Sequence, residues 1–135
     1  MSGPAKILGV DDEADFEQLI RQRFRRQIRA NEFEFHFAHH GEEALAVLAQ
    51  EPDIELLLLD INMPVMDGLT FVQRVRTRPE WRSMTLMMVT TEAEYDQIVR
   101  ALAAGAHEYL IKPFTPEAFA DKLQLLGVLP ERTAS

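Results

Sequence analysis

The sequence predicts an α/β fold, a doubly wound five-stranded parallel sheet with helices on both faces. Short apolar runs alternate along the chain with amphipathic stretches of helical length. Strands that alternate with such helices pair in parallel through right-handed crossovers. The chain has 135 residues, 47% of them hydrophobic and 27% charged, which is typical of one soluble globular domain.

In the first half of the chain, hydrophobic periodicity predicts three strands and two helices. Residues 6–10 form a short apolar run, and residues 14–30 have helical spacing of their apolar positions. Residues 32–38 alternate phenylalanine with polar residues, which favours an edge strand with one wetter side. Residues 42–50 are again helical, and residues 54–59, the densest apolar run, suit the buried middle of a sheet.

The second half of the chain repeats this scheme. Apolar residues at helical spacing predict helices at 69–78, 93–104 and 116–126. Between them, residues 85–90 and 107–111 are short runs that we interpret as strands. With the first and third strands central and the alternating strand outside, the predicted strand order is 2-1-3-4-5.

We expect one domain over residues 1–135, with its core in about residues 5–127 and a short polar tail at 128–135. The formal net charge of −8 disfavours direct contact with nucleic acid and anionic lipid. No apolar run approaches the ~20 residues of a membrane span, so we expect a cytoplasmic protein. The chain has no cysteine, so any metal site must use oxygen or imidazole ligands.

Acidic side chains follow the two strands that are predicted to lie at the centre of the sheet. Asp11 and Asp12 follow the first strand, and Asp60 follows the third. In open α/β sheets, ligands bind at the carboxyl ends of strands, near the point where the strand order reverses. We therefore expect these carboxylates to converge on one crevice, where their repulsion favours a hard divalent cation such as Mg²⁺.

The next two strands add a hydroxyl and an ammonium group to the same edge of the sheet. Thr90 ends the fourth strand, and Lys112 follows the fifth. A carboxylate nucleophile, a metal ion, an ammonium group and a hydroxyl are suited to receiving a phosphoryl group and stabilising its charge. The combination indicates phosphoryl transfer to an aspartate.

Each of these residues also has a simpler structural interpretation. Asp11 or Asp12 alone could be the N-cap of the following helix, and Asp60 alone could close an Asx-turn. Thr90 alone fits a β-branched strand residue, and Lys112 alone fits a solvated strand end. We favour the functional interpretation because independent caps and turns would not place acids on the two central strands and a hydroxyl and an ammonium group on the next two.

Five short motifs stand in order along the chain. They are VDDE at residues 10–13, LDINMPVMDG at 59–68, MVTTE at 88–92, AGA at 104–106 and YLIKPF at 109–114. Together they resemble the response-regulator receiver domain of two-component signalling, in particular its stand-alone chemotaxis-type (CheY-like) members, and they span nearly the whole chain. The resemblance implies a flavodoxin-like (βα)5 fold and a signalling phosphoacceptor, not an enzyme that acts on an external metabolite.

The resemblance also implies roles for individual residues. Asp60 would accept a phosphoryl group from the phosphohistidine of a sensor histidine kinase or of a phosphotransfer protein. Asp11, Asp12, Asp60 and the backbone carbonyl of Asn62 would organise Mg²⁺, or Mn²⁺ in its place. Lys112 would contact the phosphoryl oxygens.

A conformational switch is implied by the same resemblance. Thr90 would move to hydrogen-bond the phosphoryl group, and Tyr109 would change rotamer as Thr90 moves. The face formed by the predicted helix 93–104, the fifth strand and the last helix would then change its contacts with a downstream protein, in a monomer or a phosphorylation-dependent dimer. Asn62 and Glu92 would lie at the mouth of the site and tune the lifetime of the phosphoryl group.

Two other classes of protein share parts of this pattern. A haloacid-dehalogenase-like phosphohydrolase also combines an aspartate nucleophile, Mg²⁺, Thr and Lys, but it typically needs a second acid where this chain has Asn62. A flavin-binding flavodoxin-like module would need a hydroxyl-rich phosphate loop after the first strand. Asp11, Asp12 and Glu13 would repel a phosphate there.

Several other residues have simpler interpretations. His36, His39 and His40 are candidate metal ligands, but His39 and His40 are adjacent on a loop and point apart, so we interpret all three as solvated. Trp81 is interpreted as structural or peripheral. Core filling is expected for three methionines, Met84, Met87 and Met88. One exposed helical stripe is expected for three arginines, Arg21, Arg25 and Arg29.

Overall fold

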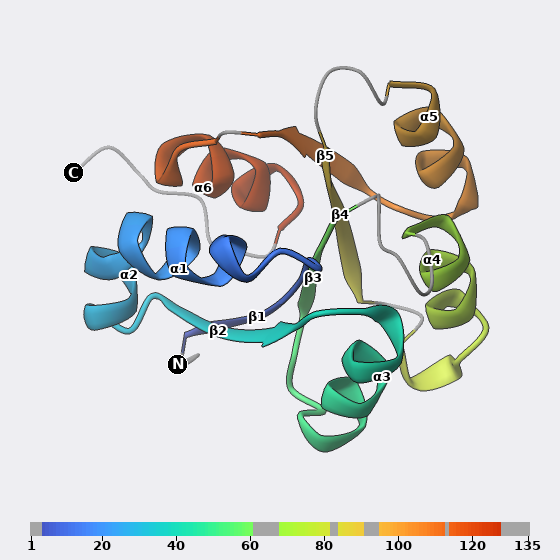
Figure 1. Ribbon diagram of the computed structural model, residues 1–135, viewed down its shortest axis with the longest axis horizontal. Helices are drawn as coiled ribbons and strands as arrows, with labels where there is room; N and C mark the ends of the chain where they lie inside the picture. The colour runs from blue at the N-terminus through green and yellow to red at the C-terminus, as the bar shows by residue number, and fades with distance from the viewer. Residues whose placement is uncertain (1–3, 61–67, 82–83, 91–94, 113, 128–135) are drawn as a thin grey trace.

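The computed structural model describes residues 4–60, 68–81, 84–90, 95–112 and 114–127. In these residues, five strands form one parallel sheet in the order β2-β1-β3-β4-β5 (Figure 1). The strands are β1 (Ala5–Val10), β2 (Phe33–Ala38), β3 (Leu56–Asp60), β4 (Thr85–Thr90) and β5 (Glu108–Ile111). The helices are α1 (Ala14–Arg23), α2 (Arg25–Arg29), α3 (Gly41–Gln50), α4 (Gly68–Arg76), α5 (Tyr95–Ala104) and α6 (Pro116–Leu125), with a 3-10 helix η1 (Pro79–Trp81). The predicted fold class and strand order are confirmed.

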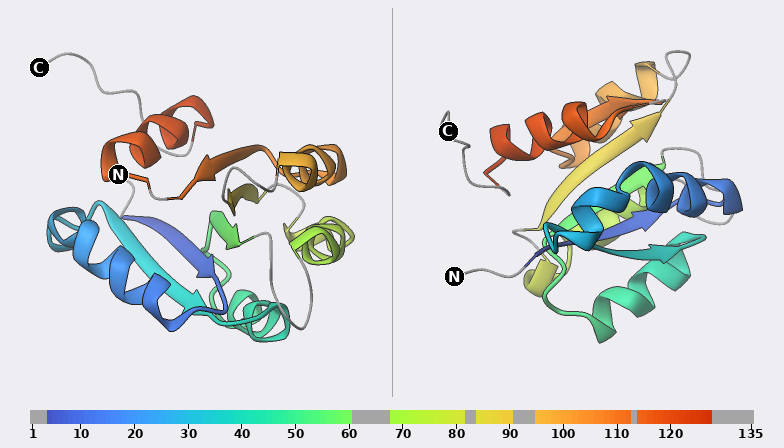
Figure 2. Two further views of the ribbon diagram at one scale, coloured as in Figure 1. Left: turned by 45° about the horizontal axis from the view of Figure 1, so that its top comes forward. Right: turned by 90° about the vertical axis from the view of Figure 1, so that its left-hand side faces the viewer.

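Different helices cover the two faces of the sheet. α1, α2 and α6 lie on one face, and α3, α4 and α5 lie on the other (Figures 1 and 2). Residues 56–59 of β3 are fully buried, and alternate members point to opposite faces. Leu57 and Leu59 belong to the cluster under α3, α4 and α5, whereas Leu56 and Leu58 belong to the cluster on the opposite face. Burial on both sides explains why this strand lacks polar alternation.

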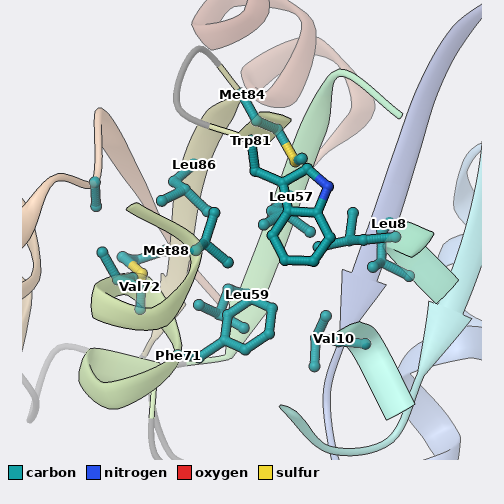
Figure 3. Close-up of a cluster of buried hydrophobic side chains, with 14 of the residues drawn as sticks. Leu8, Val10, Leu57, Leu59, Phe71, Val72, Trp81, Met84, Leu86 and Met88 are labelled. Carbon is teal, nitrogen blue, oxygen red and sulfur yellow. The ribbon is translucent and has the colours of Figure 1, made fainter. Parts of the chain in front are cut away.

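The cluster under α3, α4 and α5 is built on large side chains from several elements (Figure 3). Phe71 of α4 is fully buried, and Trp81 of η1 is 7% exposed. Of the two interpretations of Trp81, the structure supports the structural one. Met84 and Met88 belong to this cluster and Met87 to the cluster on the opposite face, so their predicted core role is confirmed.

The predicted single helix at residues 14–30 is interrupted at Phe24, and this prediction is wrong. Phe24 has φ −103° and ψ 18°, and it separates α1 from α2. Its fully buried ring contacts four other rings at centroid distances of 5.2–6.4 Å, which are those of Phe33, Phe35, Phe114 and Phe119. We attribute the break to this aromatic packing. The break also divides the expected arginine stripe between two helices.

β2 lies at the edge of the sheet, as predicted, and its two faces differ. Phe33 and Phe35 are buried against the α1, α2 and α6 side. Glu34 and His36 point to the opposite face, because successive strand residues alternate, and they are half-buried. The expected wetter side of this strand is therefore the one that faces α3.

Most element ends differ from the predicted ends by one or two residues. The predicted helix 93–104 is described from Tyr95 onward, because residues 91–94 lie outside the described residues. η1 was not predicted. Among the described residues, none of the helices combines the length and the apolar character that crossing a membrane requires.

Candidate functional site

The ends of the two central strands bring the predicted acids together. β1 and β3 are paired with Val10 opposite Leu59, so Asp11 and Asp60 follow at adjacent positions. Asp11 is 2% exposed and Asp60 is 8% exposed, whereas Asp12 is open to solvent. One carboxylate oxygen from each of the three lies within 4.8 Å of the other two. The structure thus places these acids in one cluster.

Lys112 contacts this cluster from the end of β5. Its Nζ donates a hydrogen bond to Asp11 Oδ2 at 2.8 Å and lies 3.9 Å from Asp60 Oδ2. Glu13 Oε1 is also 3.9 Å away. The Lys112 backbone is anchored because its N–H donates to the Thr90 carbonyl at 2.8 Å. Lys112 is therefore the counter-charge of the two buried acids.

The electrostatics of Lys112 follow from these contacts. Burial of the ammonium group alone would lower its pKa. The hydrogen bond to Asp11 and the negative charges of Asp60, Asp11 and Glu13 outweigh burial, and they raise the pKa of Lys112 above its ordinary value. The ammonium group stays protonated at neutral pH, and its single charge offsets only part of the charge of the three aspartates.

Asp11 also has a local structural role. Its Oδ1 accepts the Glu13 N–H at 2.9 Å, while its Oδ2 accepts from Lys112. The N-cap of α1 is Glu13, which makes no side-chain capping bond. Neither Asp11 nor Asp12 is therefore the N-cap of α1, which was their simpler interpretation. Asp11 holds the turn before the helix with one oxygen and contacts Lys112 with the other.

Thr90 and Tyr109 lie on neighbouring strands. Thr90 is 1% exposed at the end of β4. Tyr109 is aligned with Met88 of β4, and Thr90 lies two residues after Met88. The side chains of Thr90 and Tyr109 therefore point to the same face, which α4 and α5 cover. Tyr109 is half-buried, and Lys122 Nζ lies 5.0 Å from the centre of its ring. The two residues of the predicted switch therefore share one face of the sheet.

The remaining predicted site residues lie outside the described residues. They are Asn62, with its backbone carbonyl, and Glu92. Their implied roles in metal binding and in phosphoryl lifetime stay predictions.

The acidic cluster fits a hard divalent cation by its chemistry. Its ligand atoms are carboxylate oxygens, which Mg²⁺ and Mn²⁺ prefer. Two of the three acids are buried and one is exposed, so an ion could keep water ligands on its open side.

A cavity that was not predicted from the sequence borders Lys112. Its volume is about 300 Å³, and it lies between α1 and the chain that follows β5. Phe16, Leu19 and Phe114 give it apolar walls, and Arg23 lies at its margin. Leu19 is 42% exposed. The sequence carries no signal for this cavity, because helical periodicity does not report which apolar residue of α1 is left uncovered.

Comparison with known proteins gives consistent results. Residues 7–124 match the family model of the response regulator receiver domain. A chemotaxis protein CheY homolog from Campylobacter jejuni strain 81-176 is 37% identical over 119 residues, which cover 88% of this chain and 89% of that protein. CheY1 of Helicobacter pylori strain 26695 is 35% identical over 121 residues, which cover 90% of this chain and 95% of that protein. The crystal structure of CheY4 from Vibrio cholerae matches with a TM-score of 0.74 at 36% identity, covering 93% of this chain and 99% of that chain.

The family match covers most of the chain and includes the acidic cluster, Thr90 and Lys112. The expected resemblance is therefore confirmed, and the phosphohydrolase and flavin-binding alternatives are set aside. The chain belongs to the response regulator receiver domain family, and it is a phosphoacceptor of two-component signalling rather than a catalytic enzyme.

Proposed function

We propose that Asp60 is the residue of this receiver domain that accepts the phosphoryl group. The observation that carries this proposal is the position of the Asp60 carboxylate, which is 8% exposed, at the end of a central strand and 3.9 Å from Lys112 Nζ. Asp11 is buried too, and its Oδ2 lies closer to Lys112 Nζ, at 2.8 Å. Asp12 is exposed. The family match supports Asp60 over Asp11, because Asp60 stands in the motif at residues 59–68, where the resemblance to receiver domains implies the phosphoacceptor.

The phosphoryl donor in this proposal is the phosphohistidine of a sensor histidine kinase or of a phosphotransfer protein. A carboxylate oxygen of Asp60 attacks the phosphorus atom, a P–O bond forms, and the P–N bond to the imidazole breaks. The imidazole leaves with the electron pair of that bond and takes up a proton. The product is an acyl phosphate on Asp60. The apolar cavity beside Lys112 supports docking of the donor protein next to this carboxylate.

Asp11, Asp12 and Asp60 are the proposed ligands for Mg²⁺ or Mn²⁺, together with the backbone carbonyl of Asn62. When bound, the ion neutralises charge on the transferring phosphoryl oxygens. A receiver domain of the sensor histidine kinase PA1611 from Pseudomonas aeruginosa, similar in fold with a TM-score of 0.77 at 23% identity, is described with a magnesium ion coordinated in its active site cleft. Lys112 would bind the phosphoryl oxygens on the side that faces β5.

The signal would leave the domain through the face formed by α5, β5 and α6. Thr90 would move toward the phosphoryl group, Tyr109 would follow, and a downstream protein would read the change. Val99, Leu102 and Ile111 are large apolar residues that are 37–49% exposed on α5 and β5, which supports a protein-binding role for this face. Glu92 and Asn62 would set how long the phosphoryl group persists.

We further propose that residues 5–127 act as one receiver domain in the cytoplasm, as a monomer or as a phosphorylation-dependent dimer. Its partners would be proteins and not nucleic acid or a membrane surface. The net charge of −8 supports this choice of partners.

Intact-protein mass spectrometry tests the phosphoacceptor. The chain is incubated with Mg²⁺ and a small acyl phosphate donor such as acetyl phosphate. We expect one base-labile phosphoryl group on the wild type and none on Asp60→Asn. Asp53→Asn is the matched control, because Asp53 is an exposed acid that pairs with Lys6 away from the cluster, and it should be phosphorylated like the wild type. Equal phosphorylation of Asp60→Asn would contradict the assignment.

A further inference from the structure

A second group of metal-ligating side chains lies between the outer strand β2 and the end of α3. Glu34, His36 and Glu51 each offer one ligand atom, and these atoms all lie within 4.8 Å of one another. His36 Nε2 is 2.8 Å from Glu34 Oε2. All three residues are half-buried. We propose that this Glu34–His36–Glu51 cluster binds a divalent transition metal ion, with Zn²⁺ as the ion that its chemistry favours.

The backbone holds the three side chains in place. Glu34 and His36 are two residues apart on β2, so both point to the face that α3 covers. Glu51 directly follows α3, and its backbone is bonded on both sides, with its N–H donating to the Val47 carbonyl at 2.8 Å and its carbonyl accepting from the Ile54 N–H at 3.2 Å. A ligand set on a paired strand and a capped helix end needs little rearrangement to bind an ion.

The mixed ligand set distinguishes this cluster from the strand-end acids. Asp11, Asp12 and Asp60 offer oxygen atoms alone, which suits Mg²⁺. An imidazole nitrogen with two carboxylates suits Zn²⁺ better, because imidazole is a preferred ligand of Zn²⁺ and of neighbouring transition metals. Three protein ligands leave one position of a tetrahedral Zn²⁺ ion for water or for a ligand from a partner.

The charges around the cluster also favour a cation. The nearest lysine by strand register is Lys6, which is aligned with Glu34, but its Nζ forms an ion pair with Asp53 at 3.5 Å. Glu34, Glu51 and Asp53 together carry three negative charges against this single lysine. A bound divalent ion would balance that excess.

The Glu34–His36–Glu51 cluster is separate from the phosphorylation site. Glu34 is the second residue of β2, near the amino end of the strand, and Glu51 lies at the carboxyl end of α3. The strand-end acids lie at the carboxyl ends of β1 and β3. A metal at this cluster can therefore be measured while Mg²⁺ occupies the other site.

The test is a calorimetric titration of the intact chain with Zn²⁺ in the presence of saturating Mg²⁺. We expect one Zn²⁺ per chain. Loss of a residue that only hydrogen-bonds to a metal ligand typically weakens metal binding roughly 10–100-fold. His36→Gln and Glu51→Gln remove the ligands themselves, so each should weaken Zn²⁺ binding by at least this factor. His39→Gln is the matched control: His39 pairs with Glu43 at 3.2 Å, a His–Glu pair outside the three-residue cluster, and its loss should leave Zn²⁺ affinity unchanged.

Imidazole NMR spectra identify the ligand directly, because the chain has only four histidines. Substoichiometric Zn²⁺ should shift the ring signals of His36 and leave those of His39 and His40 in place. Any of three results would overturn the proposal. Zn²⁺ could shift the ring signals of His39 or His40 instead, it could bind equally well to His36→Gln and Glu51→Gln, or it could fail to bind in the presence of Mg²⁺. Circular dichroism of both variants establishes that they are folded, and Glu51→Gln serves alone if His36→Gln is not.

Discussion

At the scale of single residues, Lys112 shows how one cation is shared between acids from two strands. It bonds Asp11 directly and stands 3.9 Å from Asp60, and these acids raise its pKa. A group whose pKa is raised by folding stabilises the folded state below its ordinary pKa, and it loses this contribution as pH rises through the higher value. The contribution of Lys112 is thus fully present at neutral pH and is lost in strongly alkaline solution.

Lys112→Ala should separate phosphorylation from signalling. Mg²⁺ binding should persist because the three aspartates remain, but the amide NMR changes that phosphorylation causes over α5, β5 and α6 should be largely lost. Stability without metal should fall by about 1–3 kcal/mol, since Asp11 loses a buried hydrogen-bond partner. Lys6→Ala is the control, because Lys6 pairs with Asp53 near the amino end of β1, away from the acids and from the α5, β5 and α6 face. Normal amide changes in Lys112→Ala would contradict the role assigned to Lys112.

A second residue-scale feature lies at the opposite end of the sheet. The half-buried Arg76 donates to the carbonyls of Gly105 and Met84, at 2.8 and 2.9 Å, and lies 3.2 Å from His107 Nδ1. The same Nδ1 accepts the Leu86 N–H at 3.1 Å. Burial lowers the pKa of His107 below its ordinary 6.5, and the positive charge of Arg76 lowers it further. These contacts all favour the neutral imidazole.

The stability of the fold should therefore fall as pH drops below about 6.5, where the unfolded chain binds a proton at His107 before the folded chain does. Urea unfolding at a series of pH values measures this dependence. His107→Gln should flatten the acid side of the profile, while His39→Gln, which changes an exposed loop histidine, should leave the fall in place. An unchanged profile in His107→Gln would show that other groups cause the acid loss.

At the scale of elements, the junction between α1 and α2 depends on distant partners. Phe24 contacts rings from β2, from α6 and from the chain before α6. Helical periodicity within residues 14–30 contains no information about these rings, so sequence analysis predicted an uninterrupted helix. The edge position of β2, by contrast, was predictable because its alternation of phenylalanine and polar residues reports burial on one face.

Phe24→Ala should be strongly destabilising, by about 3–5 kcal/mol, because the large cavity left among four rings cannot collapse fully. Phe24→Leu should cost less, since much of the volume is retained. Phe37→Ala is the comparison. Because Phe37 is only half-buried, its replacement should lower the free energy of unfolding less than Phe24→Ala does. Chemical denaturation gives all three values. A loss in Phe24→Ala no larger than that in Phe37→Ala would contradict this account of the break.

At the scale of the whole molecule, the site depends on β1, β3, β4 and β5 being assembled side by side. Its acids come from the ends of β1 and β3, Thr90 from β4 and Lys112 from the end of β5. This arrangement was predictable because parallel strands of known order place all their carboxyl ends at one edge. His36 was a candidate metal ligand in the sequence but was interpreted as solvated, whereas it is half-buried and paired with Glu34. Its neighbour Glu51 was not predictable, because spacing along the chain does not report that the end of α3 lies beside β2.

Mg²⁺ should raise the stability of the whole domain, because it binds the assembled acids of the folded state. At a concentration 100-fold above its Kd the expected gain is about 2.7 kcal/mol, measured by thermal unfolding with and without chelator. Asp12→Asn should reduce this gain and, without metal, should stabilise the fold slightly by removing one repelling charge. Asp121→Asn, at an exposed position on α6, should behave like the wild type. Retention of the full Mg²⁺ effect in Asp12→Asn would exclude Asp12 as a ligand.

The place of β1 between β2 and β3 affects how the chain matures on the ribosome. Chains are made from the amino end, whereas a domain generally folds as a unit. Asp11, Asp12 and Asp60 are all present once β3 has been synthesised, whereas Lys112 is added near the end. Because the domain folds as one unit, the acids and Lys112 come together only after β5 has been made. A chain that stops before β5 should therefore have neither the folded sheet nor the assembled site.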